Sequence, residues 1–145
     1  MDVEILKLAR TGNLELLKNL NQTELANAVG QNGQSILHEA ISFSKDNIAE
    51  YAIANGVKPD AICKRGQTAL HYAAIYKNLK VTSLLLLANA DVNLADIYGN
   101  IPAWYSALSA GNLTSLKIFQ LLAKNGADLD HKNLSGRSII DIYKP

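Results

Sequence analysis

The residues of this sequence that could most readily carry out chemistry are its histidines and its single cysteine. His38 and His71 lie 33 residues apart, and neutral imidazole is a common ligand of metal ions. Cys63 could act as a nucleophile if a histidine beside it served as the general base. Nothing around Cys63 marks such a base or an oxyanion hole, so we expect an ordinary small residue. An enzyme that uses Cys63 and a histidine stays a remote alternative, and His131 has no partner at ligand spacing.

Motifs of catalytic and phosphate-binding sites do not occur in the sequence. It holds no G-x-x-x-x-G-K-[ST], H-E-x-x-H or G-x-S-x-G segment. Asp128 and Asp130 alternate within a turn, where a solvated or capping role is ordinary. Lys64 and Arg65 form a basic pair that is too small for nucleic acid, which needs contacts to several phosphates. We therefore expect no metal, no cofactor and no nucleic acid.

Composition and charge exclude further classes of protein. The 145 residues are 48% hydrophobic and 19% charged, which is typical of one globular domain. A formal net charge of +1 provides no field that would steer the chain to nucleic acid or to an anionic membrane. Because Cys63 is alone, no internal disulfide can form, which favours a reducing compartment, and we expect the cytoplasm. The acidic N-terminus is unlike a secretory signal, and the longest strongly apolar stretch, near 84–90, is too short to span a bilayer.

A repeat underlies the chain. Glycines recur with separations of 33, 33 and 37 residues, and a second set of residues recurs with separations of 33 and 37. The step from each member of the second set to the next glycine is 10 residues. The two sets are Gly33, Gly66, Gly99, Gly136 and Gly56, Asn89, Gly126. The connection between repeats therefore has constant length, and four extra residues lie between Gly99 and Gly126.

Each repeat is predicted to contain two short helices. Thr68 suits the N-cap of a first helix, because its hydroxyl can accept a hydrogen bond from an unpaired backbone N–H. Pro102 suits the first helical position of the later repeat. In the second helices, apolar residues recur at helical spacing, as in 81–86 and 118–122. His38 and His71 hold the same position in adjacent repeats, so we expect them about 10 Å apart, too far to share one metal ion with bonds of about 2 Å.

The repeats resemble those of the ankyrin family. The segment 66–74, GQTALHYAA, is similar to the signature G-x-T-P-L-H-x-A-A, and 89–93 and 126–130 are similar to G-A-D-V-N. The resemblance implies an all-α solenoid of stacked helix-turn-helix units with short β-turn or hairpin connections. One domain, 1–145, would comprise repeats at approximately 1–29, 30–62, 63–95, 96–132 and 133–145, the first and last partial. It also implies that His38 and His71 bond to nearby turn backbone.

Some positions depart from the family pattern. Trp104 stands where histidine is usual, and Asp46 occupies an apolar position of a second helix. The four-residue insertion is expected to enlarge the turn around 109–115. These departures bear on local packing and leave the fold prediction unchanged.

Stacked helix pairs leave a concave surface of turn tips and first-helix faces, which in the family carries partner binding. Phe43 and Tyr76 hold equivalent positions at the end of a first helix, and Tyr98 falls at a turn tip, where aromatic side chains can anchor an interface. The alternative is that Phe43 and Tyr76 pack on the next repeat. Tyr72 and Tyr105 share another position, where we expect packing with the hydroxyl at an edge. The predicted partner-binding residues are Gln31, Asn32, Gln34, Ser42, Phe43, Lys64, Arg65, Gln67, Ile75, Tyr76, Ile97, Tyr98, Asn100, Leu108 and Ser109.

The resemblance therefore implies a non-catalytic module that binds another protein. The chain begins with Met and holds both partial end repeats, so we expect a complete small protein that is monomeric when free. Stand-alone ankyrin proteins of this size include bacterial inhibitors. We accordingly expect an inhibitor of one partner, a toxin or an enzyme, in the manner of an immunity protein or antitoxin. The alternative is an adaptor that joins two partners, because one fold serves many functions.

Overall fold

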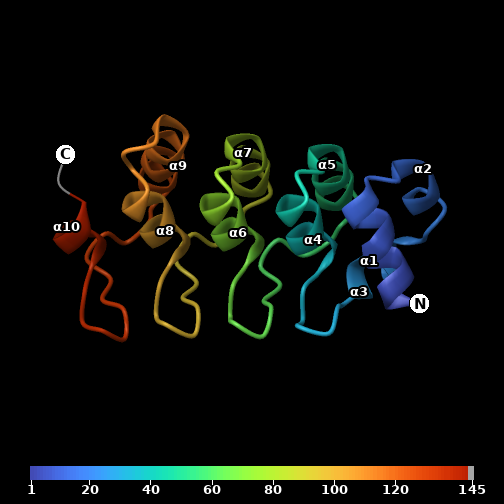
Figure 1. Cartoon of the computed structure of the whole chain (residues 1–145), viewed down its shortest axis with the longest axis horizontal. Helices are drawn as coiled ribbons and strands as arrows, with labels where there is room; N and C mark the ends of the chain where they lie inside the picture. The colour runs from blue at the N-terminus through green and yellow to red at the C-terminus, as the bar shows by residue number, and fades with distance from the viewer. Residues whose placement is uncertain (144–145) are drawn as a thin grey trace.

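The computed structural model describes residues 1–143 as a row of helix pairs, each followed by a long loop (Figure 1). Within these residues there are ten helices and no strand. The first repeat contains α1 (Asp2–Thr11), α2 (Leu14–Leu17) and α3 (Gln22–Asn27). The full repeats contain α4 (Ile36–Ser42) with α5 (Asp46–Ala54), α6 (Ala69–Ile75) with α7 (Leu79–Leu87), and α8 (Pro102–Leu108) with α9 (Leu113–Lys124), before α10 (Ile139–Ile142). The predicted all-α solenoid is confirmed, while residues 144 and 145 of the predicted last repeat lie outside the described residues.

The first helix of a pair begins at a polar cap. Thr68 is the N-cap of α6 and accepts the backbone N–H of His71, while Nδ1 of His71 accepts the backbone N–H of Thr68 at 3.0 Å. A similar reciprocal arrangement joins Ser35 and His38 at the start of α4. Pro102 begins α8, as predicted, because a first helical residue needs no N–H donor.

The core is a continuous apolar stripe between the helices of successive repeats. The first helices α4, α6 and α8 pack against one another, and so do the second helices α5, α7 and α9. Equivalent positions of the second helices are filled by fully buried side chains, namely Ile48, Val81 and Ile118, and Ala52, Leu85 and Leu122. Since each repeat buries its apolar face against its neighbours, the stack fixes where the loops lie.

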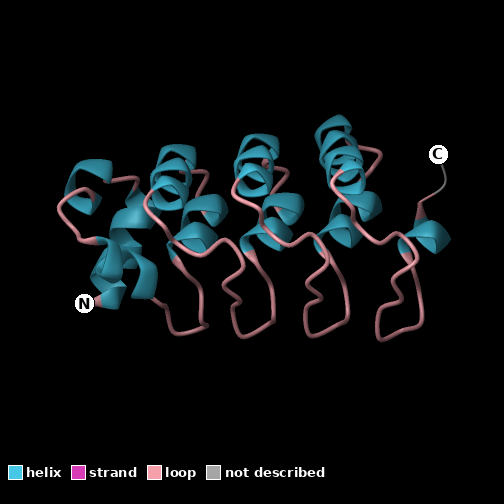
Figure 2. Cartoon of the chain, turned by 180° about the vertical axis from the view of Figure 1, so that it is seen from behind, coloured by secondary structure: helices cyan, strands magenta, loops and turns pink. Residues whose placement is uncertain are grey.

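The loops 28–35, 55–68, 88–101 and 125–138, which we call fingers, project from the same side of the row (Figures 1 and 2). Backbone hydrogen bonds join neighbouring fingers: the N–H of Lys64 donates to the carbonyl of Asn32 at 2.8 Å, and the N–H of Ile97 donates to the carbonyl of Arg65 at 3.0 Å. Gly99 turns its finger with a φ of 76°, which glycine adopts without steric cost. The predicted turn connections are therefore present, without strands in the described part of the chain.

The four-residue insertion lengthens a helix more than a turn. α9 has 12 residues where α5 and α7 each have 9. The preceding turn, 109–112, is only one residue longer than the turn 76–78. The expectation that the insertion enlarges the turn over 109–115 is therefore wrong, because most of the inserted residues lengthen α9. Residues 113–115 belong to α9, whose N-cap Asn112 accepts the backbone N–H of Ser115 at 3.1 Å.

Candidate partner-binding surface

The two histidines at equivalent positions tie neighbouring repeats together. In His38, Nδ1 accepts the backbone N–H of Ser35 at 3.0 Å, so Nε2 carries the proton and donates to the carbonyl of Gln67 at 2.8 Å. His71 repeats the arrangement one repeat later and bonds to the carbonyl of Asn100 at 2.9 Å. Burial lowers the pKa of both imidazoles, which keeps them neutral. The resemblance implied that these histidines bond to nearby turn backbone, and the structure confirms it.

The same bonds leave His38 and His71 no free group for chemistry. Both nitrogens of each ring already have partners within the protein, so neither ring offers a lone pair to a metal ion or to the Cys63 thiol. Within residues 1–143, no three His, Cys, Asp or Glu side chains gather in a way that could hold a metal ion. The histidines are therefore parts of the scaffold that carries the candidate site.

The aromatic side chains expected to anchor a partner are exposed. Phe43 and Tyr76 directly follow α4 and α6, and 50% and 53% of their surfaces are exposed. Tyr98, at a fingertip, is 53% exposed. About half of the surface of each residue is therefore free to contact another molecule. Exposed among the predicted residues are Gln31, Asn32, Phe43, Lys64, Arg65, Ile75, Tyr76, Ile97, Tyr98 and Leu108, and half-buried are Gln34, Ser42 and Ser109.

Two of the residues expected on the binding surface are buried and bonded internally. The amide nitrogen of Gln67 donates to the carboxylate of Asp96 and to the hydroxyl of Tyr105, both at 3.3 Å. The amide oxygen of Asn100 accepts from the side chain of Asn133 at 2.9 Å. Gln67 and Asn100 were expected to bind a partner, but these side chains link neighbouring fingers and face away from solvent.

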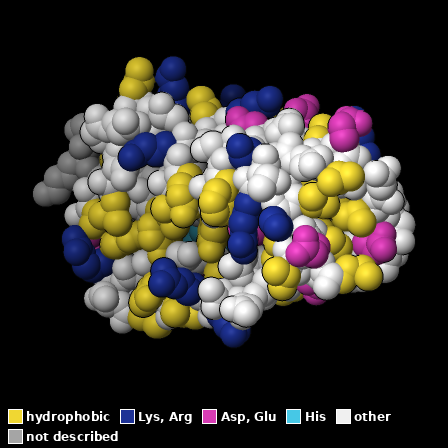
Figure 3. Space-filling model, turned by 45° about the vertical axis from the view of Figure 1, so that its right-hand side comes forward, with side chains coloured by type: hydrophobic (Ala, Val, Ile, Leu, Met, Phe, Trp, Pro, Cys, Tyr) yellow, Lys and Arg dark blue, Asp and Glu magenta, His cyan; other side chains and the backbone are white. Residues whose placement is uncertain are grey.

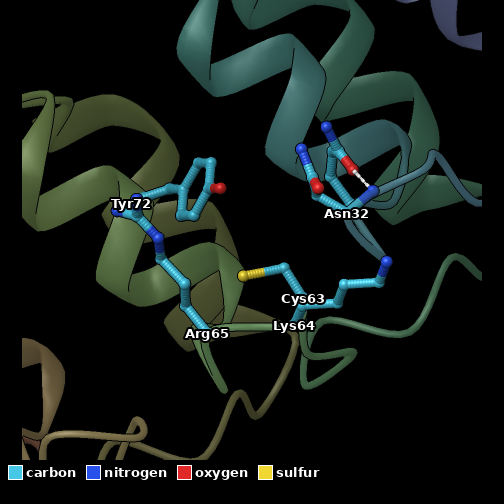
Figure 4. A pocket seen from close by; sticks show the side chains of 6 residues that line it. Asn32, Cys63, Lys64, Arg65 and Tyr72 are labelled. Atoms are coloured by element: carbon cyan, nitrogen blue, oxygen red, sulfur yellow. Dashed lines mark hydrogen bonds between the residues drawn. The ribbon is translucent and has the colours of Figure 1, made fainter.

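A pocket of about 320 Å³ lies between the first two fingers and α6 (Figure 4). Its lining residues are Asn32, Gln34, Cys63, Lys64, Arg65 and Tyr72. In Figure 4, Lys64 and Arg65 leave neighbouring backbone positions in opposite directions, so the two cations flank the pocket. The amide oxygen of Gln34 accepts the backbone N–H of Asn32 at 2.9 Å. This bond leaves the amide nitrogen of Gln34 available as a donor.

A second pocket, of about 360 Å³, shares Gln34 and Tyr72 with the first. Its other lining residues are Arg10, Glu39, Ser42, Phe43 and Tyr76. The guanidinium of Arg10 binds the buried carboxylate of Glu39 through two hydrogen bonds, of 2.7 and 3.2 Å. Because Glu39 is neutralised by this ion pair, the pocket offers its three aromatic side chains, Phe43, Tyr72 and Tyr76, beside no unpaired acidic group.

Tyr72 lines both pockets and was not predicted as a binding residue. It is half-buried, and its ring makes a T-shaped contact with the His38 ring, with centroids 4.7 Å apart. Burial raises the pKa of Tyr72 to about 12, and the Cys63 thiol beside it adds to the rise, so its hydroxyl stays protonated. The position of Tyr72 in the repeat could have indicated a binding role, since Glu39 and Tyr105 hold the same position and also carry polar groups.

The 33-residue period, the paired helices and the glycine-turned fingers define a helical-repeat solenoid. A family model described as ankyrin repeats (3 copies) matches residues 5–96 and 53–133. The chain therefore belongs to the ankyrin-repeat family, whose repeats act as protein–protein interaction modules. None of the helices in residues 1–143 is long and apolar enough to cross a bilayer.

Several curated relatives are similar over most of this sequence. A putative palmitoyltransferase, ZDHHC13 of Danio rerio, is 33% identical over 131 residues, which cover 89% of this chain and 19% of the relative. A putative ankyrin repeat protein of Fowlpox virus, FPV018, is 28% identical over 81% of this chain and 16% of its own length. The probable 26S proteasome regulatory subunit p28 of Saccharomyces cerevisiae is 30% identical over 90% of this chain and 58% of its own length. The chain thus spans less than a fifth of the first two relatives.

Proposed function

We propose that this chain is a non-catalytic inhibitor that binds one partner protein through its concave surface. The observation that supports the proposal is the pair of equivalent, half-exposed rings of Phe43 and Tyr76 beside two adjoining pockets. Aromatic side chains next to pockets supply much of the energy of protein interfaces, because their burial removes a large apolar area from water.

A preformed surface supports tight binding of a single partner. The fingers are bonded to their neighbours and the first helices are packed, so association orders few additional groups. We assign no catalytic role to Cys63, because the imidazoles of His38 and His71 are fully engaged. The description of the yeast relative as a regulatory subunit supports a role in which binding controls a partner. A monomeric chain in the cytoplasm, where the free thiol of Cys63 persists, completes the proposal.

An adaptor that joins two partners is the second candidate. It is favoured by an apolar groove of about 490 Å³ at the far end of the row, separate from the concave pockets. This groove lies between α9 and α10, and its lining includes Phe119, Leu129, Ile139, Ile140 and Tyr143. A second surface of this kind could hold a second protein while the first remained bound.

Affinity capture with matched variants tests the proposal. Wild-type chain, the double variant Phe43→Ala/Tyr76→Ala and the control Leu87→Ala are each exposed to a lysate of the native cells. Leu87 is 81% exposed and lines neither concave pocket. We expect wild type and Leu87→Ala to retain one protein whose activity the chain abolishes, and the double variant to lose it. Two proteins retained together would favour the adaptor, and retention unaffected by Phe43→Ala/Tyr76→Ala would refute binding through the concave surface.

A further inference from the structure

We propose that the pocket between the first two fingers receives the carboxylate of an Asp or Glu side chain of the partner, with apolar partner residues on either side of it. The inference rests on the proposed function, because it names the chemistry that the concave surface recognises. It is carried by the charges, the donors and the apolar neighbours of the pocket, which are independent observations.

The charge at the pocket is positive and uncompensated. Lys64 and Arg65 are exposed, and neither pairs with a carboxylate within residues 1–143, whereas Arg10 is paired with Glu39. The pocket lining contains no acidic residue. An Arg fork can hold a carboxylate through two parallel hydrogen bonds, and a neighbouring Lys adds a point charge. The pocket is therefore complementary to one anionic side chain.

The uncharged groups of the same pocket are hydrogen-bond donors. The amide nitrogen of Gln34 is free because its oxygen already accepts the N–H of Asn32. The side chain of Asn32 adds a second amide, and Tyr72 adds a hydroxyl that remains protonated. A carboxylate only accepts hydrogen bonds, so a lining of donors fits it better than it fits an amide or a cation.

At the two finger positions held by Lys64 and Arg65, the other fingers carry no charge. The positions of Lys64 and Arg65 are held by Gln31 and Asn32 one repeat earlier and by Ile97 and Tyr98 one repeat later. Phe43 and Tyr76 lie in the adjoining pocket, and the exposed Ile97 and Tyr98 lie on the next finger, which is bonded to the backbone of Arg65. Hydrophobic side chains also lie among Lys and Arg side chains on the face drawn in Figure 3. Because apolar groups lie in both neighbouring places, we expect an acidic residue with apolar residues beside it in the bound segment.

Selection from a display library of random peptides tests the inference directly. The library is selected on the wild-type chain, and the affinity of the most enriched peptide is measured. We expect enrichment of Asp or Glu flanked by apolar residues. Lys64→Gln/Arg65→Gln and the acid-to-amide change in the peptide should each weaken binding about tenfold or more, as loss of charged hydrogen bonds does. The two changes together should weaken it by less than the product, because they remove one interaction.

Matched variants separate the possible failures. The control Lys117→Gln/Lys124→Gln removes the same charge from exposed positions of α9 and should leave the affinity unchanged. Enrichment of peptides without acidic residues would overturn the carboxylate site and leave the proposed function standing. The same holds if the affinity is unchanged by Lys64→Gln/Arg65→Gln but is lost in Phe43→Ala/Tyr76→Ala. Peptides insensitive to both pairs overturn the proposed function as well, and a selection that enriches nothing counts against the carboxylate site.

Discussion

His38 and His71 show how a residue type suited to metals is used by the fold instead. Each ring accepts a backbone N–H at the start of its own helix and donates to a carbonyl that precedes the next repeat's first helix. Both functions require the neutral tautomer with the proton on Nε2, because a charged ring could not accept at Nδ1. The histidines therefore link the stability of the stack to pH.

The stability of the chain should fall on mild acidification. Burial lowers the folded-state pKa of His38 and His71, while in the unfolded chain both titrate near pH 6.5. The unfolded state thus binds more protons, so the stabilisation is complete above about pH 6.5 and is lost as the pH falls through the lowered folded pKa. Urea unfolding at a series of pH values between about 7.5 and 5 measures this loss. The variant His38→Asn/His71→Asn should show a flatter profile, and an unchanged profile would contradict the assignment.

At the scale of the element, the close stacking of the fingers requires a glycine at position 99 more strictly than at position 136. Gly99 and Gly136 have nearly the same φ, 76° and 73°. A Cβ on Gly99 would lie 2.8 Å from the backbone nitrogen of Leu134, whereas a Cβ on Gly136 would meet nothing within 4 Å. The two positions therefore share the cost of a left-handed backbone and differ in the room beside it.

Gly99→Ala should destabilise the chain more than Gly136→Ala. Each substitution carries about 1–2 kcal/mol for a left-handed conformation at a residue with a Cβ. Gly99→Ala must in addition push apart two fingers that a backbone hydrogen bond of 3.0 Å between Leu134 and Tyr98 holds together. Denaturant unfolding followed by circular dichroism compares the two free energies of unfolding. Equal losses of unfolding free energy in the two variants would show that the close approach of the fingers adds nothing to the cost of Gly99→Ala.

The second helix α9 is adapted to its place at the end of the row. Phe119 occupies the position held by Ala49 and Thr82 in the earlier second helices, and all three are buried. In the described part of the chain no further second helix packs on α9, so a large ring fits where earlier repeats need a small side chain. The ring packs instead on Tyr143, with centroids 4.4 Å apart.

Phe119→Ala should therefore cost the chain much of its stability. Removal of a buried phenyl ring costs about 3–5 kcal/mol, through lost burial and the cavity left behind. Leu113→Ala is the control on the same helix, because Leu113 is 66% exposed. Its effect should stay within about 0.5 kcal/mol. Thermal and denaturant unfolding measure both, and a small loss for Phe119→Ala would mean that α10 and Tyr143 do not cover the ring.

The sequence predicted the regular parts of these elements because they repeat. The glycine period locates the fingers, and the N-cap Thr68 and the first helical residue Pro102 locate the starts of their helices. The division of the insertion between turn and helix was not predictable, because spacing alone does not say which element absorbs extra residues. The burial of Gln67 was missed for a similar reason, since its partners Asp96 and Tyr105 belong to the next repeat.

In the whole molecule, the core and the two proposed anchors of binding are separate sets of side chains. The buried stripe between repeats holds the stack together, while Phe43 and Tyr76 are half-exposed beside pockets that the stack positions. The ion pair of Arg10 with Glu39 spans two repeats and could not be foreseen from sequence spacing. Separation of this kind predicts that the binding surface can be altered without unfolding the chain.

Phe43→Ala/Tyr76→Ala should weaken partner binding and leave the melting temperature nearly unchanged. Surface substitutions usually change stability by no more than about 0.5 kcal/mol each, so the double variant should lose far less than Phe119→Ala, although it removes two aromatic rings and Phe119→Ala removes one. A melting curve for each variant, recorded beside the capture experiment, makes the comparison. If Phe43→Ala/Tyr76→Ala lost as much stability as Phe119→Ala while the partner stayed bound, these rings would belong to the core, and the concave surface would need other anchors.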